Sequence, residues 1–259
     1  VSLNVTAMKN EVTGLMDDIY YTWGGGNGRD KSIVGQSLGS WMGYKTDGIF
    51  RTQEEVDAYR EKYKVSFGNP AVGRVRYVDT DGDGEISDRD RTWLGTDLPK
   101  AQFGLNLGAN WKGFDLSLFF NSIIRDAWNN SKFYTDFFPL WTGNHGTQLL
   151  GAAAAYDRYL ETGYYDSDVP APQVDNSNGE NEGSEYYIED GSFVRLKTLS
   201  LGYTLPKNIQ QKLCLKNARV YFQAQNLFTI TKYSGADPEG LGYPYALPRQ
   251  YTFGIQFGF

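Results

Sequence analysis

The chain has 259 residues, of which 25 are Lys or Arg and 31 are Asp or Glu, and its net charge of −6 excludes nucleic acid as the expected partner. A single cysteine and a single histidine exclude disulfide frameworks and the usual zinc sites. The high content of aromatic residues, 15%, together with 30 glycines, favours strands and turns over helices.

Alternation of apolar and polar residues predicts about seven strands. In chain order they are 1–12, 37–50, 101–112, 114–127, 193–205, 217–230 and 249–259. Because Val1, Leu3 and Val5 already alternate with polar residues, we expect the chain to open inside a strand, as a piece of a longer protein. No run reaches the roughly 18 to 20 apolar residues that a membrane helix requires.

The third and fourth segments predict a tight hairpin that turns at Lys112 and Gly113. The last segment, QYTFGIQFGF, has an apolar face and a polar face. The apolar face carries Tyr251, Phe253, Ile255, Phe257 and Phe259. Such a strand suits a wall that separates lipid from water.

The connections between these strands are unequal. Segments 51–100, 128–192 and 231–248 are long, whereas 112–113 and 206–216 are short. In a meander, successive connections lie at opposite ends, so this alternation is typical of outer-membrane barrels with long extracellular loops and a periplasmic C-terminus. Residues 13–36 do not fit, because they would be a long connection on the short side.

Two features of the long connections have specific expectations. Residues Thr52 to Tyr63 predict a short helix with Thr52 as N-cap and Glu55 closing a capping box. Residues 170–185, rich in Pro, Asn, Gly and Glu, predict a solvated, mobile external loop.

Aromatic residues gather in the loops and near strand ends. Interfacial girdles and loop packing are the favoured interpretation, and recognition of sugars or peptides is the alternative. These residues are Tyr20, Tyr21, Trp23, Trp41, Tyr44, Trp128, Phe133, Tyr134, Phe137, Phe138 and Trp141.

The stretch DTDGDGEISDRD is close to a calcium-binding loop, since oxygen ligands at alternating positions can surround one Ca2+ and Gly84 permits the sharp turn. The candidate ligands are Asp79, Asp81, Asp83, the carbonyl of Glu85, Ser87 and Asp90. An Asp at the twelfth position, where Glu is usual, and a preceding strand argue against a paired calcium sensor. The alternative is an acidic surface turn.

No catalytic constellation stands out, so we expect a protein that is not an enzyme. His145 lies in a polar loop and is expected at the surface, and Cys214, between two leucines, is expected to be a small buried apolar residue. Carboxylates such as Asp166, Asp168 and Glu180 show no spacing that indicates a glycosidase pair.

Several ordered motifs resemble SusC/RagA-type TonB-dependent transporters of the bacterial outer membrane. They include VGQSLGSWMGYKTDGIFRTQEEVDAY at 34–59, VRYVDTDGDGEISDRDRTWLG within 75–120, SFVRLKTLSLGYTLP at 192–206, ARVYFQAQNLFTIT at 218–231 and the closing YPYALPRQYTFGIQFGF. The resemblance runs through nearly the whole chain.

The resemblance implies an all-β, antiparallel transmembrane β-barrel segment. Residues 1–259 would be about seven C-terminal strands of a large plugged barrel of about 22 strands. The ending resembles the signal read by the barrel-assembly machinery, with Gly254, Phe257 and Phe259 as its residues.

The resemblance also implies a function, which is energy-coupled import of oligosaccharides or peptides with a SusD-like surface lipoprotein. TonB would act through the N-terminal part, and outer-membrane lipid would surround the wall. The family often keeps the acidic loop, which supports a structural cation at Asp79 to Asp90.

Two alternatives remain open at this point. The first is a secreted, soluble β-domain with a calcium-stapled loop that binds glycans, and such a domain must bury its apolar faces together. The second is an external glycosidase domain, which a carboxylate pair at a suitable separation would support.

Overall fold

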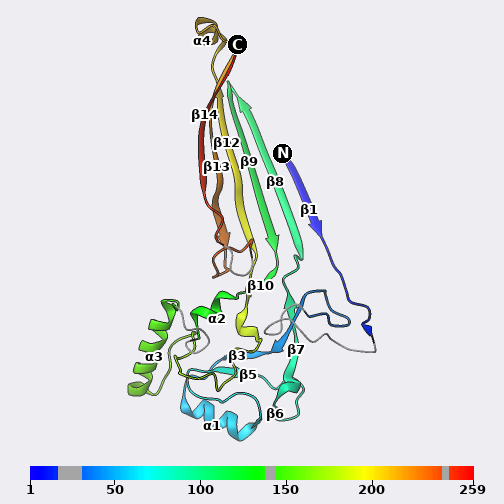
Figure 1. The fold of residues 1–259 in the computed structure, drawn as a ribbon, viewed down its shortest axis with the longest axis vertical. Coiled ribbons are helices and arrows are strands. Elements are labelled where there is room, and N and C mark those ends of the chain that lie inside the picture. Colours follow the sequence, from blue (N-terminus) through cyan, green and yellow to red (C-terminus); the bar gives the residue numbers. More distant parts are fainter. Residues whose placement is uncertain (17–30, 138–143, 241–244) are drawn as a thin grey trace.

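The computed structural model describes residues 1–16, 31–137, 144–240 and 245–259. They form a tall antiparallel sheet, here called the wall sheet, and a folded body at one of its ends, here called the cap (Figure 1). No helix in the described ranges is both long and apolar enough to cross a membrane.

The wall sheet has six strands in the order β1-β8-β9-β12-β13-β14, and each neighbouring pair is antiparallel. The strands are β1 (Ser2–Ala7), β8 (Ala101–Trp111), β9 (Phe114–Ile124), β12 (Phe193–Thr204), β13 (Asn217–Thr231) and β14 (Gln250–Gly258). With β1 and β14 at its edges the sheet is open, which is the form expected of part of a barrel.

Short connections lie at the end of the wall opposite the cap. The β8–β9 hairpin turns at Lys112 and Gly113, as predicted, and both residues have positive φ, 45° and 89°. Two successive positive φ values define the turn whose twist matches paired strands. Helix α4 (Lys207–Lys212) and the C-terminus lie at the same end (Figure 1).

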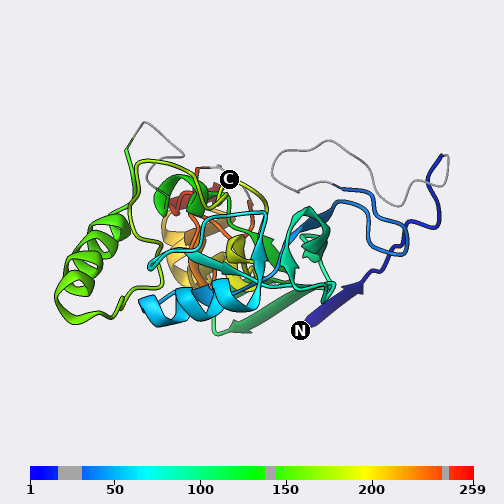
Figure 2. The ribbon, with the colours of Figure 1, turned by 90° about the horizontal axis from the view of Figure 1, so that it is seen from below.

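The cap contains the remaining elements, and Figure 2, viewed from the cap end, shows α1 and α3 among them. Strand pairs β2–β7, β3–β5 and β10–β11 are antiparallel, and β4–β6 is parallel. The strands are β2 (Ser40–Tyr44), β3 (Thr46–Ile49), β4 (Lys64–Val65), β5 (Val75–Tyr77), β6 (Glu85–Ile86), β7 (Arg91–Thr96), β10 (Asp126–Trp128) and β11 (Ile188–Asp190). The helices are α1 (Gln53–Lys62), η3 (Asp88–Asp90), α2 (Ser131–Thr135), α3 (Gln148–Thr162) and η5 (Glu185–Tyr187).

The predicted strand 37–50 is not a wall strand, which corrects the count from about seven to six in the described residues. It forms β2 and β3, which pair with β7 and β5 inside the cap. Trp41 and Tyr44 are buried there, whereas a wall strand must leave one face to lipid. The described residues between β1 and β8 therefore belong to one long connection at the cap end, so no separate connection on the short side is needed.

Helix α1 forms where the sequence predicts it. The Thr52 hydroxyl accepts a hydrogen bond from the Glu55 amide at 3.3 Å, which caps the first turn. The Glu55 carboxylate accepts from the Arg51 amide at 2.8 Å and not from the Thr52 amide, so the predicted capping box is not closed. Val56 and Tyr59 are buried against the cap core.

The cap core consists largely of aromatic side chains, and several of the loop aromatic residues are packed in it. Trp41, Tyr44, Trp128 and Phe137 are buried in one cluster, so loop packing applies to them and an interfacial girdle does not. Trp128 stacks on Tyr187 with ring centroids 5.3 Å apart. Tyr20, Tyr21, Trp23, Phe138 and Trp141 lie outside the described residues.

Residues 170–185 are packed into the cap, so the prediction of a solvated loop is wrong. Ala171, Asn178, Glu180 and Ser184 are all buried. Polar composition suggested solvent, but these polar groups have protein partners, since the Asn178 amide donates to the Glu180 carboxylate and to the Val75 carbonyl.

The central contact of this segment is an ion pair between Arg74 and Glu180. Their charged atoms are 2.5 Å apart, and the side chains are only 2% and 1% exposed. Arg74 also donates to the Ala171 carbonyl at 2.6 Å. Two buried charges are stable only together, so this pair fastens residues 170–185 to the strand β5 region.

Cys214 is exposed, which contradicts the expectation of a buried residue. It lies two residues beyond helix α4 and has a φ of 55°, so it belongs to the turn that leads into β13. The left-handed backbone turns the chain at this point, and the neighbouring leucines do not bury the thiol.

We expect Glu180→Ala to destabilise the cap by about 3 to 5 kcal/mol, because it leaves the Arg74 charge buried and unpaired. Hydrogen-exchange mass spectrometry on peptides covering residues 70–78 measures this as faster exchange. The control is Lys64→Ala, which removes the exposed ion pair with Glu85 and should cost below about 1 kcal/mol. Equal effects of the two variants would contradict the role of the buried pair.

Candidate functional site

One face of the wall sheet is apolar and open. The pairings place Leu199 beside Leu118 and Ala224, and place Phe222 beside Phe253, all on this face. Many of its side chains are exposed, with Phe253 at 80%. The exposed members include Leu3, Val5, Phe114, Leu116, Val194, Leu201, Val220, Phe228, Ile230, Tyr251, Ile255 and Phe257. Among the described residues no second sheet covers this face, which argues against a soluble sandwich.

The opposite face of the wall sheet, here called the polar face, is rich in uncharged hydrogen-bonding groups. Directly paired residues share a face, so Ser200 lies beside Ser117 and Gln223. Amide side chains on this face include Asn4, Gln102, Asn106, Asn110, Asn121, Asn217, Gln223, Gln225, Gln250 and Gln256. Glycines 104, 108, 202 and 254 also lie on the polar face.

The charges of the polar face are paired in two places. Near the short turns, Arg219 of β13 and Asp115 of β9 form an ion pair of 2.5 Å. It passes over Gly202 of β12, where an added Cβ would collide with both side chains. Gly202 therefore allows a charge pair to lie flat across three strands.

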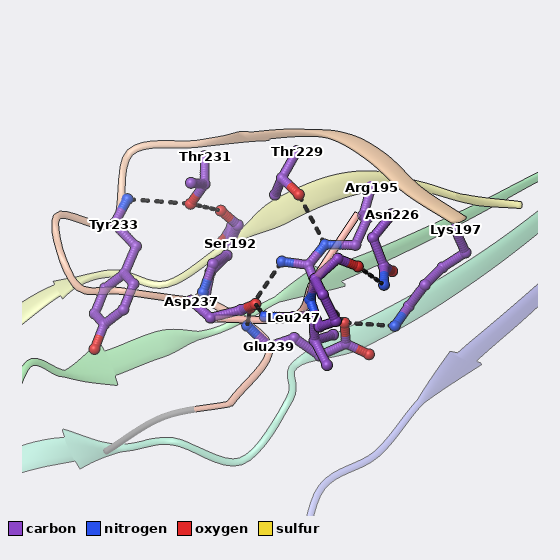
Figure 3. A network of polar contacts seen from close by, with 12 residues as sticks. Ser192, Arg195, Lys197, Asn226, Thr229, Thr231, Tyr233, Asp237, Glu239 and Leu247 are labelled. Carbon is purple, nitrogen blue, oxygen red and sulfur yellow. Dashed lines mark hydrogen bonds and ion pairs between the residues drawn. The ribbon is translucent and has the colours of Figure 1, made fainter. Parts of the chain in front are cut away.

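The second place lies near the cap and is here called the latch. It joins the 231–248 connection to the polar face, as Figure 3 shows. Arg195 donates to Asp237 and to Glu239, each at 2.7 Å, and Lys197 lies 2.6 Å from Glu239. Arg195 also donates to the Thr229 hydroxyl at 2.7 Å, which fixes its guanidinium against the sheet.

Both sides of the latch are held by further contacts. Asp237 accepts from the amides of Glu239 and Leu247, at 2.9 and 3.0 Å, so its carboxylate also organises its own loop. A register shift between Leu196 and Thr198 interrupts the strand at Lys197. Such a bulge re-aims side chains, and here it sits where Lys197 reaches the loop.

The electrostatics of the latch favour an ionised Asp237. Burial acts to raise the pKa of Asp237, but hydrogen bonds from Arg195 and from the amides of Leu247 and Glu239 outweigh it and lower the pKa below its ordinary value. The folded loop is therefore stabilised by the charged form.

The acidic loop brings together only part of its predicted ligand set. Carboxylate oxygens of Asp79, Asp81 and Asp83 lie within 4.8 Å of one another. Each carboxylate accepts a hydrogen bond from a backbone amide of the loop. The Gly84 amide donates to Asp79 at 3.0 Å, and the Glu85 amide donates to Asp83 at 2.8 Å. The loop is thus ordered with three carboxylates close together.

The other predicted ligands have different partners. Asp90 is buried, and its carboxylate accepts from the amides of Thr80 and Ser87, at 2.7 and 2.8 Å. The Ser87 hydroxyl caps η3. The Glu85 carboxylate accepts hydrogen bonds from the Ser66 hydroxyl and the Lys64 ammonium group, and these two contacts hold its pKa below the usual range.

The remaining candidates are more dispersed. His145 is partly buried, with Nδ1 3.1 Å from the Tyr134 carbonyl oxygen. Gly254 and Phe257 lie in β14, on the polar and apolar faces respectively, and Phe259 follows the strand with 83% of its surface exposed.

Sequence reasoning missed both the latch and the Arg74–Glu180 pair. The latch had a local signal, since two basic residues inside a wall strand, Arg195 and Lys197, require opposite charges nearby. The pair Arg74–Glu180 had none, because its members are far apart in the sequence.

Comparison with known proteins agrees with this architecture. A search of protein-family models finds no match for the chain. The chain is 32% identical over 92% of its length to TonB-dependent receptor P3 of Formosa agariphila, and 28% identical over 98% of its length to TonB-dependent receptor SusC of Bacteroides thetaiotaomicron. It spans 23% of the length of each of these relatives.

Solved structures give the same result. The structure of the RagAB peptide transporter matches with a TM-score of 0.69 and 26% identity, over 98% of this chain and 26% of that chain. The RagAB peptide importer in its open-open state matches with a TM-score of 0.67 over 99% of this chain.

The wall sheet is therefore a segment of a large antiparallel transmembrane β-barrel, with a polar face and a face for lipid. More narrowly, the chain is of the SusC/RagA type of TonB-dependent receptor, as its sequence motifs predicted.

We expect acid to release the latch. Because the pKa of Asp237 is lowered in the folded protein, its contribution to stability is present above the unfolded pKa of about 3.9 and is lost as the pH falls through the folded value. Hydrogen exchange in residues 232–240, corrected for the intrinsic effect of pH, should accelerate below about pH 4.

Asp237→Asn should make this exchange faster by about tenfold or more at neutral pH, since a hydrogen bond to a charged group contributes about 1.5 to 3 kcal/mol. It should also weaken the acid dependence, with Glu239 as the carboxylate that remains in the latch. The control is Asp190→Asn, which removes an exposed carboxylate bonded to the Ser192 amide. An unchanged acid dependence in Asp237→Asn would show that another group holds the loop.

Proposed function

We propose that the chain is the C-terminal part of the barrel wall of an energy-coupled importer in the bacterial outer membrane. The observation that carries this proposal is the separation of the wall sheet into an exposed apolar face and a polar face whose charges are paired. The first suits lipid and the second suits a hydrated lumen. In the complete barrel, strands β1 and β14 would pair with further strands, since an open edge cannot face lipid.

The unequal ends of the wall support an orientation. Long connections form the cap at one end, and the two-residue hairpin turn, α4 and the C-terminus lie at the other (Figure 1). Outer-membrane barrels carry their long loops outside and their short turns in the periplasm. The cap is then extracellular, and Gly254, Phe257 and Phe259 lie near the periplasmic end as an assembly signal.

The proposed partners follow from the relatives. RagAB is named as a peptide transporter and SusC as a TonB-dependent receptor, and neither name describes an enzyme. A SusD-like lipoprotein would cover the cap, and TonB would act through a plug formed by the N-terminal part of the complete protein. The protein would transport its cargo without changing it chemically.

The polar face favours an uncharged cargo. Its strands carry amides and hydroxyls, and its charges are neutralised in the latch and in the Asp115–Arg219 pair. Such a surface exchanges hydrogen bonds with a neutral oligosaccharide without leaving a charge unpaired. A peptide is the second candidate, favoured by the similarity to RagAB.

The assignment of faces can be tested with two neighbouring residues of β12. Leu199→Arg places a charge on the lipid face and should destabilise the barrel by about 2 to 4 kcal/mol, whereas Ser200→Arg on the lumen face should cost about 1 kcal/mol or less. Membrane fractionation with an antibody to the C-terminal peptide, followed by electrophoresis without boiling, measures how much compact barrel each variant forms.

Loss of compact barrel in Ser200→Arg with none in Leu199→Arg would show that the faces are reversed. Recovery of the unsubstituted chain as a soluble species of 29.2 kDa would instead favour the secreted domain.

We also propose that Ca2+ binds the acidic loop as a structural ion. Asp79, Asp81 and Asp83 would hold it, since their clustered carboxylates supply the oxygen ligands that Ca2+ prefers. Asp90 would not bind the ion but would hold the loop in shape, because its carboxylate accepts hydrogen bonds from the Thr80 and Ser87 amides. The ion would offset the repulsion of three adjacent negative charges.

We expect about 1 mM Ca2+ to raise the free energy of unfolding of the cap by about 0.4 to 1.4 kcal/mol, as for a site with a dissociation constant of about 0.1 to 1 mM. Asp81→Asn should abolish the rise, because the amide keeps the acceptor for the Asp83 amide but removes the charge. Asp157→Asn, in helix α3, is the control and should keep the rise. Calorimetric titration without a binding signal in the unsubstituted protein would refute the site.

A further inference from the structure

A pocket lies where the cap meets the wall beside β1. Its volume is about 440 Å3. It is open to solvent on one side and is lined by the residues that follow β1, the turn before β2, and the segment that leads from β7 into β8. The lining residues are Met8, Lys9, Asn10, Glu11, Gly35, Gln36, Ser37, Trp93, Thr96, Leu98, Pro99 and Lys100. Apolar and hydrogen-bonding groups therefore meet in one cavity.

Trp93 is the large aromatic residue of this pocket, and the local backbone presents it. The register between β2 and β7 shifts at this point, so that Trp41 faces Gly95, Met42 faces Trp93, and Leu94 is the extra residue. Leu94 packs against the cap core, while Trp93 is left 41% exposed. A bulge is a usual way to aim one side chain out of a sheet toward a ligand.

The indole of Trp93 is also held in a fixed orientation. Its Nε1 donates to the Ser40 hydroxyl at 3.0 Å, and this buried hydroxyl donates to the Ser37 carbonyl at 2.5 Å. A flat apolar ring fixed at a pocket wall is already ordered before a ligand arrives, which reduces the entropy that binding costs.

The polar groups of the pocket are close to neutral in sum. Lys100 is paired with Asp126 at 2.8 Å, and Lys9 and Glu11 carry opposite charges. The Asn10 carboxamide oxygen accepts from the Leu38 amide and the Ser37 hydroxyl, at 2.8 and 3.1 Å. This contact orders the turn before β2 and leaves the Asn10 amino group as a donor.

From this geometry we infer that the pocket binds a sugar unit of a neutral oligosaccharide, with the ring stacked on Trp93. A sugar ring offers one apolar face for the indole and hydroxyls at its edge for amide and hydroxyl partners such as Asn10, Gln36 and Thr96. The inference rests on the proposed import function and deepens it, because it places a binding subsite for the cargo on the extracellular end of the wall.

The test uses the complete protein in detergent, labelled with fluorotryptophan and observed by fluorine NMR. The probes are neutral hexasaccharides of glucose, mannose and xylose, and a charged hexapeptide. Trp93→Phe identifies the Trp93 resonance by removing it. A bound saccharide should shift this resonance and leave that of Trp111 unchanged, since Trp111 lies at the opposite end of the wall.

Calorimetry on two variants gives an independent readout. Trp93→Ala should weaken saccharide binding by about tenfold, or about 1.4 kcal/mol, because it removes the flat ring on which the sugar would stack. Trp93→Phe, which keeps a flat ring, should weaken it by less than about threefold.

The outcomes separate this inference from the proposed function. Saccharide binding with an unshifted Trp93 resonance and an unchanged affinity in Trp93→Ala overturns the subsite but leaves import of saccharides intact. Binding of the charged peptide with no saccharide binding overturns both the subsite and the neutral cargo. The shift can be read in the unsubstituted protein, so the test holds even where Trp93→Ala fails to fold.

Discussion

The register of the wall sheet is the constraint on which the rest of the structure depends. Side chains alternate with a period of two, so a slip of one residue in any pair would move the apolar set of that strand to the other face. The pairing of Leu199 with Leu118 and of Ser200 with Ser117 keeps the apolar and polar residues of these two strands on separate faces. Where the register shifts, at Lys197, the sheet meets the loop that the latch holds.

The wall and the cap remove their apolar side chains from water in different ways. The wall is one layer thick and leaves its apolar face exposed, so lipid must complete it. The cap closes around its own aromatic core and buries an ion pair, Arg74–Glu180, that fixes one of its longest irregular segments. The latch connects the two parts, because Arg195 belongs to a wall strand and Asp237 to a connection at the cap end.

In the proposed importer, this arrangement places hydrogen-bonding groups along the path of the transported molecule. The polar face presents hydrogen-bonding groups, and its charges are paired in the latch and in the Asp115–Arg219 ion pair. At the cap end, the bulge in β7 exposes Trp93 beside a pocket of near-neutral charge. A fixed scaffold with a neutral, hydrated surface suits passage of a polar cargo better than tight capture of an ion.

The sequence by itself determined the two-faced wall strands, the Lys112–Gly113 turn, helix α1 and the resemblance to SusC/RagA-type receptors, because these depend on local periodicity and on short motifs. Only the tertiary structure decided that residues 37–50 belong to the cap, that 170–185 are packed, and that Arg195 meets Asp237. Alternation reports that a segment is a strand, but not which strand it pairs with. Likewise a polar composition cannot tell solvent from a buried partner, because Glu180 is satisfied by a residue far away in the sequence.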